Sequence, residues 1–332
     1  MKGVVKKIIV MMLIIVVFTS TSVQAIKINS KSRIEKAEAN GAKIKDLSEN
    51  DLDPYVDLKV TVTINKIRTL EELDKFSEPD FFVKILINDD EKISKTWKNQ
   101  KFVEEEWSFT SNVRDDKEIV NIEIELWDED PIINTLCDIA KNDNQNPNRK
   151  SLSLQYSLKS GHWLGDDSIS WAHSWDPDYS GYGRACGCDD NSIYEEDDDC
   201  EIWFDITQSD FDGDGIPYWT EVNRFGTDPT VDDTGRDDDN DGVPIEWEWK
   251  WGYIIGYDHQ NHTYTSHWQY DPFEYEDHKN LDPDGDSLTN YEEYLVSEWY
   301  SDPFRKDIYV ELDEMGPGPN GEPKSKLPEE SK

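Results

Sequence analysis

The sequence predicts a mainly β protein, in which an antiparallel β-sandwich is followed by a small module of acidic loops and short helices. Between residues 58 and 206, apolar residues alternate with polar ones in several short segments, which is the pattern of half-buried strands. Turn-rich acidic segments separate these strands, and no long amphipathic helix intervenes. After Thr207 the alternation disappears and Asp-rich loops take over, so we place a domain boundary near Gln208.

The N-terminal 25 residues have the three regions of a secretory signal peptide. A basic start with Lys2, Lys6 and Lys7 precedes an apolar run over residues 8–18. A small-polar stretch then ends at Ala25, which completes a cleavage site. The apolar run is short for a bilayer-spanning helix, so a retained anchor is the weaker alternative. We therefore expect a secreted or cell-surface protein.

Acidic side chains dominate the composition, with 73 Asp and Glu against 34 Lys and Arg. Removal of residues 1–25 takes away three Lys, which leaves 31 basic side chains and a net charge of −42. This charge excludes ordinary nucleic-acid binding and opposes general adsorption to anionic membranes. Aromatic residues make up 12%, including 13 Trp, and argue for packed cores. Bound divalent cations would let acids cluster in spaced sets, whereas a merely solvated acidic surface would scatter them.

The predicted sandwich covers residues 54–207 and follows a polar linker over residues 26–53. Its clearest strand begins after Leu58, where Val60, Val62 and Ile64 alternate with polar residues. Further strand candidates are residues 81–87, 107–109, 119–127, 152–158 and 201–206. In the segment 119–127, Ile122, Ile124 and Leu126 are expected to share one face. Such spacing fits an antiparallel β-sandwich.

Four cysteines follow the leader: Cys137, Cys186, Cys188 and Cys200. In a secreted chain they are more typical of disulfides than of metal ligands. Cys186 and Cys188 are too close for a ready bond to each other, so we expect one of them to bond Cys200. A zinc site is the alternative, although no second paired-Cys motif or nearby His completes it.

Three loops carry oxygen donors at the spacing that wraps a calcium ion. Calcium takes six to eight oxygens, and a twelve-residue loop supplies them from positions one, three, five and twelve and from the carbonyl of position seven. The expected ligands are Asp210, Asp212, Asp214, Ile216 and Glu221 in the first loop, Asp237, Asp239, Asp241, Val243 and Glu248 in the second, and Asp282, Asp284, Asp286, Leu288 and Glu293 in the third. Position six is Gly215, Gly242 and Ser287 in turn, and Asn290 gives the third loop a polar ninth position. A solvated acidic loop is the alternative.

These EF-hand-type loops resemble the Asp-rich calcium repeats of thrombospondin type 3 and dockerin-like modules over residues 208–303. The resemblance rests on the D-x-D-x-D-G-[IV]-P pattern and on the G-T-D-P element at residues 226–229. It implies that Asp228 and Asp302 are secondary ligand candidates. An insert over residues 249–279, rich in Trp, Tyr and His, interrupts the array; we expect a packed or exposed aromatic loop there, with a transition-metal site at its histidines as the alternative.

The β region resembles a C2 domain. Asp74 and Asp80 match the first calcium loop of that family, although Pro79 and Asp80 stand in swapped order. Asp128, Asp130 and Asp138 match its third loop, with a longer spacing before Asp138. The resemblance implies a Greek-key sandwich with a cup for calcium at one end. Ordinary acidic turns are the alternative.

The sequence lacks the motifs of common catalytic sites. No H-E-x-x-H, G-x-S-x-G or Gly-rich phosphate loop is present. We therefore expect a non-catalytic calcium-binding module with calcium ions as its cofactor, and with an extracellular protein or an anionic lipid surface as candidate partner. The segment 305–313 reads as a first strand of a further domain, and residues 304–332 as that strand plus a charged tail. This junction resembles the one in large secreted proteins where calcium repeats precede a metallopeptidase-like domain. The resemblance implies the alternative function, the non-catalytic N-terminal part of a secreted hydrolase, a metallopeptidase.

Overall fold

The computed structural model describes residues 51–73, 77–140, 149–167, 178–179, 183–187, 198–258 and 263–309, with only the backbone described at residues 178–179, 254–258 and 263–267. The predicted signal peptide, nearly all of the predicted linker, and the tail beyond residue 309 lie outside this range. The chain divides into two compact units. Unit 1 runs to Asn240 and resumes from Pro244 to Tyr275, and unit 2 consists of Asp241–Val243 and the chain from Glu276 onward. Within the described residues, no helix is both long and apolar enough to cross a membrane.

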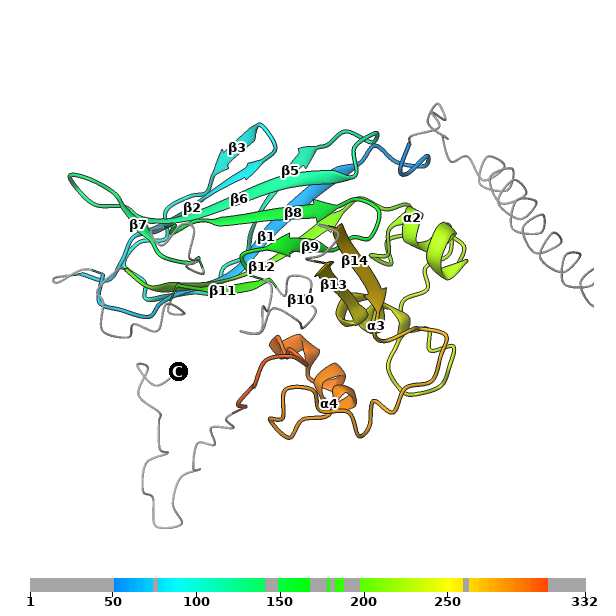
Figure 1. The fold of residues 1–332 in the computed structure, drawn as a ribbon. Coiled ribbons are helices and arrows are strands. Elements are labelled where there is room, and N and C mark those ends of the chain that lie inside the picture. Colours follow the sequence, from blue (N-terminus) through cyan, green and yellow to red (C-terminus); the bar gives the residue numbers. More distant parts are fainter. Residues whose placement is uncertain are drawn as a thin grey trace, which may run out of the picture. The chain divides into compact units, whose positions relative to one another are not determined.

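The first sheet of unit 1 is built around β1, whose long alternating sequence pairs on both of its edges (Figure 1). The strand order is β11-β12-β1-β4, and β5 also pairs with β1. The bounds are Lys59–Thr69 for β1, Phe102–Val103 for β4, Trp107–Asn112 for β5, Arg184–Cys186 for β11 and Cys200–Gln208 for β12. The β1–β12 pair is antiparallel and joins segments far apart in the sequence, with Val62 opposite Ile206.

The second sheet is centred on β6 and is also antiparallel. Its order is β3-β2-β6-β8-β9, and β7 pairs with the end of β6. The bounds are Phe81–Ile87 for β2, Asp90–Ile93 for β3, Ile119–Asp128 for β6, Thr135–Cys137 for β7, Leu152–Ser157 for β8 and Trp163–Gly165 for β9. Ile122, Ile124 and Leu126 share one face, as expected, and each is at most 2% exposed.

Side chains from both sheets form one hydrophobic core, as the period-two patterns predict. Along β1 the alternation buries Val60, Val62 and Ile64, and then changes phase so that Ile67 is buried as well. The change coincides with a register shift against β12 between Ile64 and Lys66. A β-bulge of this kind keeps both halves of a long strand directed into the core.

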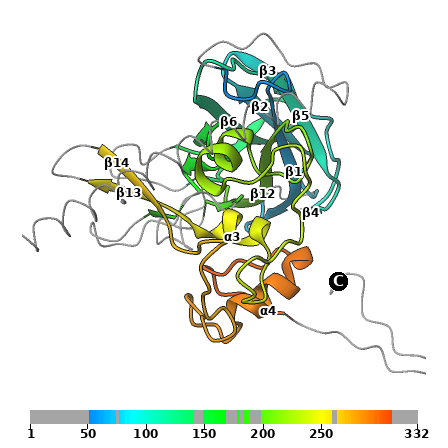
Figure 2. The ribbon, with the colours of Figure 1, turned by 90° about the vertical axis from the view of Figure 1, so that its right-hand side faces the viewer.

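The aromatic insert contains a β-hairpin, where we expected a packed or exposed aromatic loop. β13, Tyr253–Asp258, pairs antiparallel with β14, Thr263–Trp268 (yellow in Figure 2), and the short β10, Asp178–Tyr179, pairs with β13. Its strands, YIIGYD and TYTSHW, are rich in the β-branched and aromatic residues that favour strands. The β10–β13 pairing places the hairpin in unit 1 with the residues of the sandwich, and not in a separate repeat array.

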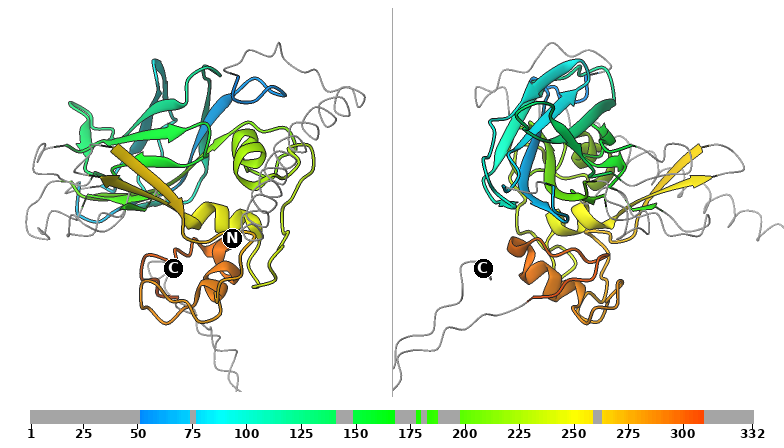
Figure 3. Two further views of the ribbon diagram at one scale, coloured as in Figure 1. Left: turned by 45° about the vertical axis from the view of Figure 1, so that its right-hand side comes forward. Right: turned by 90° about the vertical axis from the view of Figure 1, so that its left-hand side faces the viewer.

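Short helices follow the acidic loops. In unit 1 these are α2, Tyr218–Thr220, a π-turn at Glu221–Phe225, and α3, Ile245–Gly252. Unit 2 contains α4, Asn290–Leu295 (orange in Figure 3), and a 3₁₀ turn at Ser297–Trp299. Thr289 and Glu292 form a capping box at the start of α4, which satisfies its free N-terminal amides. Residues 305–309 form no strand, contrary to expectation, and Ile308 is 87% exposed.

Candidate metal centres

The first acidic loop, in unit 1, brings its carboxylates together as the spacing predicts. Ligand atoms of Asp210, Asp212 and Asp214 lie within 4.8 Å of one another. The Asp210 carboxylate accepts a hydrogen bond from the amide of Gly213, and Gly215 adopts a φ of +87° that favours glycine. The turn therefore presents three carboxylates on the inside of one loop.

Glu221, at the twelfth position, closes the first loop. Its side chain forms a second group with Asp214 and Asp233, and all three residues are buried. Burial is the largest cause that raises the pKa of Glu221 to about 9, and the charges of Asp212 and Asp214 raise it further. Burial likewise raises the pKa of Asp212 to about 6. Such convergence of acids is favourable only when protons or cations neutralise them.

The third loop, in unit 2, repeats this arrangement. Asp282, Asp284 and Asp286 have ligand atoms within 4.8 Å of one another. Asp282 accepts from the amide of Gly285 at 2.8 Å, at the same position as the Asp210–Gly213 bond of the first loop. Ser287 stands at position six with a φ of +85°, close to the value of Gly215. The serine substitution therefore preserves the turn, in a conformation that L side chains rarely adopt.

Glu293, the twelfth residue of the third loop, is the most unusual group of this site. The residue is 1% exposed, and neither oxygen of its carboxylate has a hydrogen-bond partner among the described residues. Burial is the largest cause that raises its pKa to about 8, and the charges of Asp307, Asp286 and Asp284 add to the shift. A buried carboxylate without a donor is costly, and a cation bound between it and its acidic neighbours would remove that cost.

The fifth-position aspartates hold each loop in the same way. Oδ1 accepts from the amide of position seven, and Oδ2 accepts from the amide of an acidic residue further along the chain. The donors are Ile216 and Asp233 on Asp214 (2.8 and 3.4 Å), Val243 and Glu276 on Asp241 (3.0 and 3.4 Å), and Leu288 and Asp307 on Asp286 (2.7 and 2.8 Å). We call Asp233, Glu276 and Asp307 the closing acids.

Sequence reasoning missed the closing acids, although the signal is present. Each lies five residues after the Asp of an Asp-Pro pair, at Asp228, Asp271 and Asp302. Each of these three aspartates accepts, through Oδ1, from the amide two residues on, at 3.3, 3.1 and 3.0 Å. The repeated unit is therefore longer than the twelve-residue loop and includes an Asp-Pro turn and a closing acid.

The second loop is divided between the two units. Residues 237–240 and 244–248 belong to unit 1, and Asp241–Val243 belongs to unit 2. In unit 1, Asp237 Oδ1 accepts from the amide of Asn240 at 2.7 Å, the counterpart of the bonds made by Asp210 and Asp282. Asp239 is half-buried, and Glu248 in α3 is 1% exposed. In unit 2, Asp241 and Val243 are buried.

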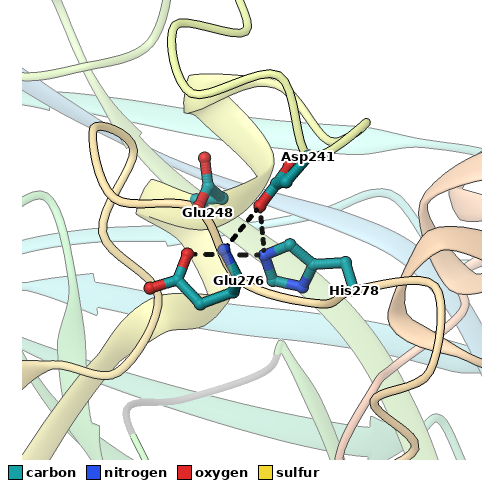
Figure 4. A group of neighbouring side chains, drawn as sticks. All are labelled: Asp241, Glu248, Glu276 and His278. Carbon is teal, nitrogen blue, oxygen red and sulfur yellow. Dashed lines mark hydrogen bonds and ion pairs between the residues drawn. The ribbon is translucent and has the colours of Figure 1, made fainter.

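Unit 2 adds a cluster with a nitrogen donor. Asp241, Glu276 and His278 each offer one ligand atom, and these atoms lie within 4.8 Å of one another (Figure 4). His278 Nε2 is 3.2 Å from Asp241 Oδ2 and 3.9 Å from Glu276 Oε2. Asn290 contacts the opposite side of the imidazole, with Nδ2 3.0 Å from His278 Nδ1. The ninth position of the third loop is thus directed at His278.

The predicted cup of the sandwich remains a prediction. Asp74 lies outside the described residues. Asp128 Oδ1 accepts from the amide of Asp80 at 2.7 Å, which places these two residues side by side. Asp130 accepts from Thr135, and Asp138 is buried at 2% exposure. Within the described ranges, the groups of three or more ligand atoms within 4.8 Å all come from the acidic loops and the Asp241 cluster.

The described cysteines differ from the pairing that we expected. Cys200 is a buried free thiol that lies against Cys137, and burial raises its pKa well above the usual range. Cys186 is opposite Glu201 in the β11–β12 register, so Cys200 itself is directed to the other face of that ladder. Cys188 lies outside the described residues.

One family comparison agrees with the sandwich. Residues 58–143 match the family model of the C2 domain. A structure titled a C2 domain is 14% identical, with 46% of this chain and 98% of that chain covered and a TM-score of 0.25. For a C2 domain of plant Extended Synaptotagmin 1, the identity is 13%, the coverage 45% and 94%, and the TM-score 0.25.

Human GIVD cytosolic phospholipase A2, in complex with an inhibitor and terbium chloride, is 13% identical over 46% of this chain, with a TM-score of 0.24. This chain covers only 17% of that protein's length. No curated protein sequence matches the chain. The family match, together with the two antiparallel sheets, identifies the sandwich as a C2-type fold.

Proposed function

We propose that this protein is a non-catalytic calcium-binding module whose acidic loops are held in shape by calcium. The observation that carries the proposal is Glu293, which is 1% exposed and whose carboxylate oxygens have no hydrogen-bond partner in the part of the chain that the structure describes. Burial is the largest cause that raises its pKa, and the charges of Asp286 and Asp284 in the same loop raise it further. Calcium accepts a bidentate Glu at this position together with Asp oxygens from positions one, three and five.

The small size of unit 2 supports a structural role for the ion. Its described part contains one short helix, α4, and one 3₁₀ turn, and the core cluster of the chain contains none of its residues. Such a segment buries little apolar surface to offset its ordering entropy, so ligand binding must supply much of its stability. Calcium in the loops would therefore be a condition for a folded unit 2.

The direct test is calcium titration by calorimetry, combined with metal analysis of the purified chain. E293Q should lose about one bound calcium per chain, because the amide removes the charge and one of the two equivalent oxygens. E292Q is the matched control, since Glu292 is exposed and Gln also serves in a capping box. Calcium stoichiometry unchanged in E293Q would contradict the proposal.

A lipid surface is a second candidate partner, through the sandwich. Ile132 and Ile133 are 92% and 77% exposed in the segment between Asp130 and Asp138, which are two of the predicted cup residues. Adjacent exposed apolar side chains beside acidic residues suit a surface that calcium bridges to anionic headgroups. The match of residues 58–143 to the C2 domain supports this candidate.

We further propose that the protein acts outside the cell or at its surface, on the basis of the leader-like residues 1–25. The alternative function, the non-catalytic part of a secreted hydrolase, stays open as a proposal. N-terminal sequencing of the protein from its native host tests the first, since cleavage after Ala25 is expected. A longer native product with an H-E-x-x-H motif beyond residue 332 would favour the alternative.

A further inference from the structure

We propose that Asp241, Glu276 and His278 form a mixed imidazole–carboxylate site that prefers a transition divalent cation, such as Mn²⁺ or Zn²⁺, to calcium. The inference rests on the proposed calcium-binding function, because Asp241 is a fifth-position ligand of one of the calcium loops. It assigns that loop a cation chemistry different from that of the first and third loops.

The ligand atoms of this cluster differ from those of the first and third loops. The other loops offer carboxylate oxygens, whereas this cluster adds the Nε2 of an imidazole that is 0% exposed. Calcium is bound by oxygen ligands, while imidazole suits the later transition ions and carboxylates suit manganese. A buried nitrogen donor among carboxylates therefore shifts selectivity away from calcium.

The distances fit a small ion. Zinc is bound at about 2.1 Å by nitrogen and oxygen ligands, so two ligands of a tetrahedral ion lie about 3.4 Å apart. His278 Nε2 and Asp241 Oδ2 are 3.2 Å apart, and Nε2 and Glu276 Oε2 are 3.9 Å apart. Only a small movement of the Glu276 side chain would place all three donors around one ion.

Asn290 is placed to orient the imidazole. A metal-binding histidine usually donates its other ring N–H to an acceptor, which fixes the tautomer that ligates through the remaining nitrogen. The Asn290 Nδ2 lies 3.0 Å from Nδ1, and the Asn290 Oδ1 has no hydrogen-bond partner within the described ranges. Exchange of the amide oxygen and nitrogen, which have nearly the same shape, lets Nδ1–H donate to Oδ1 without breaking another bond of that oxygen.

The third loop has a different residue at the position that corresponds to His278. His278 lies two residues after the closing acid Glu276, and Tyr309 lies two residues after the closing acid Asp307. Burial is the largest cause that raises the pKa of Tyr309 to about 12, and the charges of Asp307 and Glu293 add to the shift. The two loops thus place different side chains, an imidazole and a phenol, beside equivalent acids.

The test uses Mn²⁺ as the probe, with the full chain in a large excess of calcium. Manganese is chosen because thiolates do not favour it, so the cysteines do not compete. We expect one bound Mn²⁺ per chain, with a ¹⁴N coupling from one imidazole in electron spin-echo spectra. H278Q should abolish the nitrogen coupling and lower the Mn²⁺ affinity at least about tenfold. Y309F, the matched control in the third loop, should change neither.

The outcomes separate the two proposals. Absence of nitrogen coupling in the unaltered chain overturns the mixed site, even if H278Q fails to fold, and leaves His278 as an ion-pair partner of Asp241. An H278Q chain that folds and keeps the Mn²⁺ affinity also overturns it. Failure of the calcium function would appear instead as no calcium uptake by the first and third loops, while the Mn²⁺ signal persisted.

Discussion

The backbone amide of Asp307 donates a hydrogen bond to Oδ2 of Asp286 at 2.8 Å and so ties the segment after α4 to the third loop. Asp286 Oδ1 is bound at the same time by the amide of Leu288. One carboxylate therefore organises both the loop and a segment 21 residues away along the chain. The first and second loops contain the same arrangement, which places a closing acid beside each fifth-position aspartate.

Replacement of a closing acid should weaken its loop. We expect D233N to lower calcium affinity at the first loop about tenfold, because the Asp233 carboxylate lies with those of Asp214 and Glu221. D232N is the matched control, since Asp232 is an exposed neighbour outside this group. Calorimetric titration of both variants checks the prediction. The same calcium affinity in D233N as in D232N would contradict it.

Relief of backbone strain should stabilise the third loop. Ser287 has a φ of +85°, a conformation that glycine adopts at no steric cost. We therefore expect S287G to raise the free energy of unfolding of the calcium-loaded chain by about 1 kcal/mol. G215S, in the first loop, should lower it by a similar amount. Chemical denaturation measures both, and a destabilised S287G would show that the serine side chain makes a stabilising contact.

Protons should compete with calcium. Burial raises the pKa of Glu221 to about 9 and that of Glu293 to about 8, from a usual value of 4.5. Between pH 4.5 and these values the ion-free folded chain binds more protons than the unfolded chain, so its stability falls as pH rises through this window. At pH 7, calcium should displace these protons. Calorimetry in two buffers of different ionisation enthalpy measures the release, and a heat independent of buffer would contradict it.

Chelation should destabilise the acidic loops. Each occupied site contributes about 2.7 kcal/mol when calcium is at 100 times its Kd, so removal from several sites should cost several kcal/mol. We expect the melting temperature to fall in excess chelator and to recover with calcium. Magnesium is the control ion and should restore less, because it demands a smaller octahedral site. The same melting curve with and without chelator would show that the loops hold their shape without calcium.

Vesicle binding should depend on the exposed isoleucines. We expect the full chain to sediment with anionic vesicles only when calcium is present, because its net charge is −39 without ions. The double variant I132S/I133S should bind several-fold less, since it removes two exposed apolar side chains. I308S is the control, as Ile308 is also exposed but lies in unit 2. Sedimentation without calcium, or equal binding by the double variant, would argue against the lipid surface.

The sandwich strands could be predicted because one face of each is buried. The segment predicted at residues 81–87 is β2, and the segment at 119–127 is β6 apart from one residue. The short edge strands β3 and β4 were missed, since two to four residues carry no periodic signal. The β13–β14 hairpin was missed for another reason, because its strands do not alternate regularly between apolar and polar residues.

The loop geometry followed from spacing within twelve residues, whereas the closing acids and the His278 cluster did not. Ligands within one loop are fixed by local turn geometry, which the sequence shows directly. Glu276 and His278 lie 35 and 37 residues after Asp241, so only the fold brings them together. The repeated spacing from Asp-Pro to the next acid was the one local signal, and it becomes meaningful once the hydrogen bonds are known.

The hydrogen bond between a fifth-position aspartate and its closing acid also bears on where this chain could accept an insertion. The two hydrogen-bonded residues are 19 positions apart in the first loop, 21 in the third and 35 in the second. The additional length in the second loop contains the β13–β14 hairpin. Loop-closure entropy grows only with the logarithm of length, so lengthening from about 20 to 35 residues costs about 0.5 kcal/mol. The interval between α3 and the Asp-Pro turn is therefore a position at which the repeat tolerates insertion. A small domain grafted there should leave the ion sites intact.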